Sequence, residues 1–155
     1  MFGWSEAIQI LAGCIGTLGF ALLYNIRGRR LIYAAIGGLL SWLFFLLFGL
    51  IVQNDVLQSF LSAVLVTAYA EVLARALRTP ATTFSIVSLI PLVPGSSLYY
   101  SMTAALSETY VDFLDRATYT LKIAAALSMG LILVTAVSKH VRLWAQHRTE
   151  RAGTR

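Results

Sequence analysis

The chain has few charged residues, and this scarcity limits the class of protein to which it can belong. Only 12% of its 155 residues are Asp, Glu, Lys or Arg, whereas 58% are hydrophobic. Soluble domains carry about 25% charged residues, and disordered chains are poorer in hydrophobic residues than this one, so both classes are excluded. The hydrophobic residues come in blocks long enough to cross a bilayer, which indicates an integral membrane protein. No hydrophilic block or Pro/Gly/Ser-rich linker separates these blocks, so we expect a single transmembrane domain over 1–155.

Other scarce residues exclude further classes. Cys14 is the only cysteine, so no disulfide can form within the chain, and His140 and His147 have no acidic partner at ligand spacing. The sequence also has no glycine-rich phosphate loop and no serine elbow. We therefore predict no enzyme activity, no cofactor and no metal site. The net charge of +5 lies at the ends of apolar blocks, so nucleic-acid binding is not expected.

Five apolar blocks predict an all-α, polytopic membrane helix bundle. The first block does not resemble a cleaved signal peptide, because the MFGWSEA start has no basic residue. Small residues at 12, 16 and 19 give the first span a face suited to close helix approach or self-association. The second block is the most lipid-like, so we expect it to be partly lipid-facing. The predicted spans are 7–26, 31–52, 56–77, 80–107 and 117–138, with an acidic loop at Ser107, Glu108, Asp112 and Asp115 and a basic, headgroup-bound tail over 139–155 whose last residues are disordered.

The basic residues orient the bundle, because Lys and Arg accumulate on the cytoplasmic side of membrane proteins. Two basic residues, Arg116 and Lys122, do not fit the placement that follows. With five spans, the rule places the N-terminus outside and the C-terminus in the cytoplasm. The other ten of the twelve basic residues then share the cytoplasmic side: Arg27, Arg29, Arg30, Arg75, Arg78, Lys139, Arg142, Arg148, Arg151 and Arg155.

The fourth span is predicted to be broken within Pro91 to Gly95. The uncharged stretch from 79 to 107 has 29 residues, more than the ~20 that an unbroken span requires. Prolines remove backbone donors and clash with the preceding turn, so we expect the helix to unwind there and to restart at Ser96. Such a restart presents free N–H groups and the positive end of a helix dipole, which suit a carboxylate. The candidate substrate-binding residues are Pro91, Pro94, Gly95, Ser96, Ser97, Tyr99 and Tyr100.

Glu71 and Arg75 are the ionisable pair of the third span, and two readings of them stay open. They are one helical turn apart with the acid first, so they can form an ion pair that fixes the depth of the helix. Alternatively, Glu71 faces a cavity and carries a coupling proton, since intramembrane carboxylates are often functional. The sequence does not decide between them.

A known family shares the most distinctive residues. Arg78, Thr79 and Pro80, Phe84, the segment Ile90–Gly95 and Tyr99 resemble the threonine/serine exporter family, in particular its short membrane component, which is equivalent to the C-terminal half of the fused exporters. The resemblance covers all five spans. It implies export of small amino acids or of dicarboxylates such as succinate, and a location in the bacterial cytoplasmic membrane. It also implies a larger partner subunit, because the N-terminal half of the fused exporters is absent.

The sequence therefore predicts a secondary-transporter subunit for small carboxylate-bearing metabolites, embedded in the lipid bilayer. The alternative is a non-transporting membrane scaffold or auxiliary subunit in which the broken helix is only structural.

Overall fold

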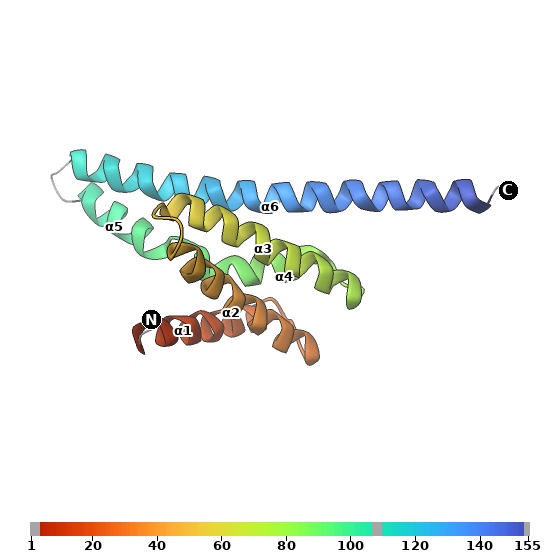
Figure 1. Cartoon of the computed structure of the whole chain (residues 1–155). Coiled ribbons are helices and arrows are strands. Elements are labelled where there is room, and N and C mark those ends of the chain that lie inside the picture. Colours follow the sequence, from red (N-terminus) through yellow and green to blue (C-terminus); the bar gives the residue numbers. More distant parts are fainter. Residues whose placement is uncertain (1–3, 107–109, 154–155) are drawn as a thin grey trace.

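The computed structural model describes residues 4–106 and 110–153, and these residues are helical apart from short connections (Figure 1). Apolar composition and length make most of the helices membrane-sized. Four are long and apolar enough to span a membrane, and a fifth span is obtained if the bent pair is counted as one. The helices in order are α1 (Trp4–Leu23), α2 (Arg29–Gly49), α3 (Asp55–Ala76), α4 (Ala81–Leu89), the 3-10 turn η1 (Ile90–Leu92), α5 (Gly95–Leu106) and α6 (Tyr110–Gly153).

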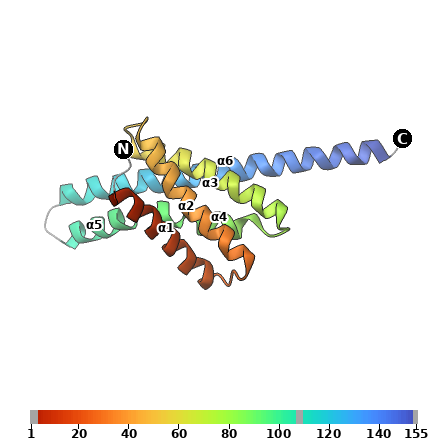
Figure 2. The same cartoon turned by 60° about the horizontal axis from the view of Figure 1, so that its bottom comes forward.

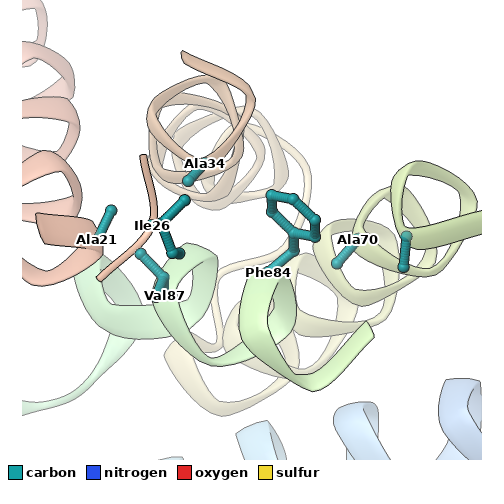
Figure 3. Close-up of a cluster of buried hydrophobic side chains, with 7 residues drawn as sticks. Ala21, Ile26, Ala34, Ala70, Phe84 and Val87 are labelled. Atoms are coloured by element: carbon teal, nitrogen blue, oxygen red, sulfur yellow. The ribbon is translucent and has the colours of Figure 1, made fainter. Parts of the chain in front are cut away.

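Helices α2 and α3 form the centre of the bundle. Helix α2 packs against α1, α3 and α4, and α3 packs against α2, α4 and α6. At one end, small residues allow close packing around Phe84 of α4, which lies between Ala34 of α2 and Ala70 of α3 (Figure 3). Ile26, in the loop after α1, enters the same core beside Val87. Its burial fixes the path of the loop between α1 and α2.

Helix α1 is more exposed than α2, although the second span is the one expected to face lipid in part. Within the most apolar 18-residue stretch of each helix, α1 buries only 11% of its residues, compared with 28% for α2. The aromatic residues Trp42, Phe44 and Phe45 of α2 are half-buried and pack on a second core cluster that includes Leu92 and Ile123. The partial exposure expected for α2 is present at Ile32, Ile36 and Leu47, whereas its buried glycines and alanines form a separate close-packing face.

Helix α6 corrects two predictions about the last third of the chain. Asp112 and Asp115 belong to the first turns of α6 and not to a loop, a position that the helix dipole favours for acids. Ser107 and Glu108 lie outside the described residues. The segment expected to form a disordered tail is helical through Gly153, so α6 has 44 residues and is about 66 Å long. The side chains of Arg142, His147, Arg148 and Arg151, like residue 155, lie outside the described part.

The basic segments gather at one end of the bundle. The loops after α1 and after α3 line a common pocket there, and Arg75 lies beside Val141 near the end of the α6 span. At the opposite end, the Tyr119 hydroxyl of α6 donates a 2.6 Å hydrogen bond to Asp55 at the start of α3. Helix α5 and the first turns of α6 run side by side and extend beyond this end (Figures 1 and 2). The alternation of loops is therefore as predicted, whereas the side of the membrane on which each end lies stays a prediction.

Candidate functional site

The helical segment that follows α3 is broken where the prolines predict. Helix α4 tightens into η1 at Ile90, Val93 is extended, and α5 restarts at Gly95, with a 58° bend between the two halves. Pro91 and Pro94 have no N–H to donate, so the helical ladder cannot continue through them. The turn is held by local bonds instead: the N–H of Val93 donates to the carbonyl of Ile90 at 3.1 Å, and that of Gly95 to Val93 at 2.7 Å.

The break is braced from three directions. A Cβ placed on Gly13 of α1 would lie 3.5 Å from Pro91, so a small residue at 13 lets α1 approach the turn. Leu92 is buried in the cluster formed with Ala63 of α3 and Leu127 of α6. Because α1, α3 and α6 all contact the turn or its neighbours, the geometry at the restart of α5 is fixed by the bundle.

An open pocket of about 500 Å³ lies beside this restart. The first turns of α5 form one wall and the first three turns of α6 form the other. Four of the lining residues are charged or phenolic side chains from α6, which faces the hydroxyls of α5. The lining residues are Ser96, Ser97, Tyr100, Asp112, Asp115, Arg116 and Tyr119.

Hydrogen bonds hold the two walls of the pocket together. The hydroxyls of Ser97 and Thr120 lie 2.8 Å apart, and that of Ser101 lies 3.3 Å from Thr120. Ser101 also donates to the Ser97 carbonyl at 2.8 Å. The Arg116 guanidinium lies 5.7 Å from the ring centre of Tyr100, a cation–π distance. These contacts fix α5 against α6 and position the Arg116 cation at the pocket.

The α6 wall of the pocket carries groups of opposite charge. Arg116 and the first N–H groups of α5 can bind an anionic oxygen, since guanidinium groups and helix N-termini both favour carboxylates. Asp112 and Asp115 can bind a cation such as an ammonium group. The arrangement suits a small molecule that carries both charges.

The structure brings together only part of the predicted site. Ser96, Ser97 and Tyr100 line the pocket, whereas Tyr99 is exposed and packs edge-on against Tyr100 with ring centres 5.6 Å apart. Pro91, Pro94 and Gly95 shape the turn without lining the pocket. Gly95 has no positive φ, and a Cβ added to it would meet open space, so the turn does not require glycine there.

Sequence reasoning missed the α6 side of the pocket. Asp112 and Asp115 were assigned to a loop, and Arg116 was treated only as an exception to the charge rule. The signal was present: an arginine that departs from the charge rule, with acids one and four positions before it, marks an unusual polar cluster at a membrane-helix end. That this cluster shares a pocket with the serines of α5 could not be predicted without knowing how α5 packs along α6.

Glu71 and Arg75 form the predicted ion pair, with 3.6 Å between Nη2 and Oε2. Glu71 is only 6% exposed, while the Arg75 side chain is 44% exposed. Both also line a mostly apolar groove of about 450 Å³ between α3 and α6, opposite Leu133 and Val137. Glu71 and Arg75 can therefore act as an ion pair that fixes the depth of the helix. The Glu71 carboxylate also lies beside a groove, which a role as carrier of a coupling proton requires.

Together, the apolar helices, the broken fourth span and the polar pocket at its restart define a multi-pass membrane protein of the transporter type. Residues 9–137 match the family described as "Threonine/Serine exporter, ThrE", and the chain belongs to that family. The match begins within α1 and ends one turn before the end of the apolar part of α6. No solved structure matches this chain.

Proposed function

We propose that this chain is the membrane subunit of a secondary transporter in the bacterial cytoplasmic membrane, which exports a small carboxylate-bearing metabolite together with a larger partner subunit. The family membership supports an exporter. The observation that carries the substrate class is the position of Arg116 beside the restart of α5, at Ser96 and Ser97. In this proposal the substrate carboxylate binds between the guanidinium and the first turn of α5.

The two acids of the pocket favour an amino acid over a dicarboxylate. Asp112 and Asp115 supply negative charge on the same wall as Arg116. They attract the ammonium group of threonine or serine, whereas they repel the second carboxylate of succinate. We therefore propose that threonine or serine is the preferred substrate, with the carboxylate on Arg116 and the ammonium on the acids.

Export of labelled substrate tests this site. Arg116→Gln removes the cation, so we expect the initial rate at low cytoplasmic threonine to fall at least tenfold, at unchanged membrane abundance. Lys122→Gln is the matched control, because it removes the other exceptional basic charge from the same helix without touching the pocket. Ser96→Ala removes one hydroxyl, for which we expect a milder loss.

The break itself needs a separate variant. Replacing both prolines, Pro91→Leu with Pro94→Leu, should let the span wind continuously and withdraw the α5 N-terminus from the pocket. Export should then fall as it does for Arg116→Gln. If folded, normally abundant Arg116 and double-proline variants both export at the wild-type rate, the break is a packing feature and the scaffold role replaces the transport site.

A further inference from the structure

A second pocket lies at the other end of the bundle, between the loops that follow α1 and α3. Its volume is about 270 Å³. The two loops, 24–30 and 77–83, contain four arginines and no acid. The pocket is lined by Tyr24, Asn25, Ile26, Arg27, Arg30, Thr79, Pro80, Thr83 and Phe84.

The charge in this pocket is uncompensated. Arg27 and Arg30 both line it, and no acid is among the lining residues. The nearest acid along either loop is Glu71, which lies further into α3 and pairs with Arg75. Two guanidinium groups that share one pocket repel each other unless an anion lies between them.

Neutral donors surround the same space. Pro80 precedes α4 as its N-cap residue and no side-chain bond caps that helix, so its first N–H groups have no capping side chain. Thr79 lines the pocket, and its hydroxyl oxygen is buried without a hydrogen-bond partner among the described residues. A buried hydroxyl without a partner costs free energy that a ligand oxygen would recover.

The backbone of both loops is also unusual. Asn25 has φ 58° and Arg78 has φ 50°, and these two are the non-glycine residues with positive φ in the described part of the chain. Each ends its helix in a left-handed turn, a position that glycine usually occupies. Arg78 adds a fourth arginine to these two segments, although it does not itself line the pocket.

We infer that this pocket binds a phosphate group, held by Arg27 and Arg30 with the Thr79 hydroxyl and the first turn of α4. A phosphate fits better than a carboxylate, because donors converge from several directions and a phosphate offers three or four oxygens to meet them. The phosphate can belong to an anionic lipid head group or to a soluble ion, since the pocket lies at one end of the apolar helices. The inference is independent of the transport site beside Arg116.

Binding to the purified full chain in a neutral detergent tests this inference with two probes. Inorganic phosphate is titrated at constant ionic strength while the melting temperature is followed, and short-chain phosphatidylglycerol is counted by native mass spectrometry. We expect at least one probe to bind, and binding to weaken about tenfold in Arg27→Gln and in Arg30→Gln. A response to inorganic phosphate identifies a soluble source, and a response to phosphatidylglycerol alone identifies a lipid.

Arg29→Gln is the control, because Arg29 lies between the two arginines, carries the same charge and does not line the pocket. A second variant, Thr79→Val, removes the unpartnered hydroxyl without changing the side-chain shape. We expect it to melt no lower than the wild type without ligand and to bind the probe more weakly. Failure of both probes to bind, or an equal loss of binding in Arg29→Gln, would overturn the inference.

Discussion

At the scale of single residues, Glu71 is the charge whose position is hardest to explain by packing alone. It is 6% exposed among the apolar side chains of α3 and α6, and its partner Arg75 remains partly exposed. A buried carboxylate of this kind costs free energy unless it is paired. The ion pair with Arg75 reduces that cost, and Arg75 keeps contact with the polar surface through its long side chain.

Glu71→Gln separates the two readings of this residue. If the pair is only structural, the variant should lose about 1 kcal/mol of stability and export normally in folded protein, because one arm of the pair is partly exposed. If Glu71 carries a coupling proton, export should lose its pH dependence at unchanged membrane abundance. The measurement is the initial export rate between pH 5.5 and 8, at about half-unit steps. A wild-type pH profile in this variant would remove the proton-carrier role.

What the sequence predicted at this scale depended on backbone chemistry and not on side-chain contacts. Pro91 and Pro94 determine a break wherever they stand, so its position was predictable from local rules. The acids that face Ser96 were not, because their contact depends on how α5 packs along α6.

At the scale of helices, glycines set how closely the elements approach. A Cβ added to Gly130 of α6 would lie 2.8 Å from the Cβ of Ala63 and 3.0 Å from the carbonyl oxygen of Phe60, both in α3. One added to Gly38 of α2 would overlap Thr17 of α1, with 2.8 Å to its Cγ2 atom. These are the small-residue contacts that allow membrane helices to pack closely, so both crossings depend on the missing side chain.

Gly130→Ala and Gly38→Ala should therefore destabilise the bundle by about 1–3 kcal/mol each, the usual cost of overpacking a core. The larger loss is expected at Gly38, because the added methyl overlaps the Cβ of Thr17, which rotation of the Thr17 side chain cannot move, more closely than the methyl at Gly130 meets Ala63 and Phe60. Gly16→Ala is the matched control, because a Cβ there meets nothing within 4 Å. Unfolding in a mixed detergent, followed by tryptophan fluorescence, measures the differences. Equal stability of Gly130→Ala and Gly16→Ala would contradict this account of the α3–α6 contact.

Helix boundaries were predictable within a few residues where charges or turn residues mark them. The Asn54 side chain caps α3 by accepting a hydrogen bond from the N–H of Val56 at 3.0 Å. The predicted third span begins at Val56, one residue after the start of α3. The start of α6 was missed because its acidic first turns look like a loop by composition. The end of α6 at Gly153 was not predicted, because the basic segment after 138 has no apolar periodicity and the helix continues through it nevertheless.

At the scale of the whole molecule, the distribution of charge predicts the orientation in the membrane. Gln53, beside the start of α3, lies at the same end as the Asp55–Tyr119 contact, whereas Arg29 lies at the end with the basic loops. In a background with Cys14→Ala, single cysteines at 53 and 112 should react with an impermeant thiol reagent added outside the cell, and those at 29 and 148 should not. Labelling at 29 from outside would reverse the orientation.

Two apolar surfaces of the molecule are exposed. Helix α5 packs mainly on α6, and its Leu98, Met102 and Leu106 are 53%, 62% and 90% exposed. Gly16 and Gly19 of α1 also face open space. Lipid can cover both surfaces, yet a span that is broken beside a polar pocket requires protein or water next to its free backbone. The α5 surface is therefore the one where we expect the larger partner, and the α1 face the one where we expect self-association.

Reconstitution tests that division of roles. An odd number of spans places a related second half upside down relative to the first, which is the inverted-repeat arrangement common in transporters. Purified chain alone in liposomes should then export no labelled threonine, and addition of the larger family subunit should restore export. Met102→Lys, on the exposed face of α5, should prevent restoration by placing a charge in the contact, whereas Gly16→Leu should abolish only self-association, measured by crosslinking. Robust export by the chain alone would show that the pocket beside α5 is complete without a partner.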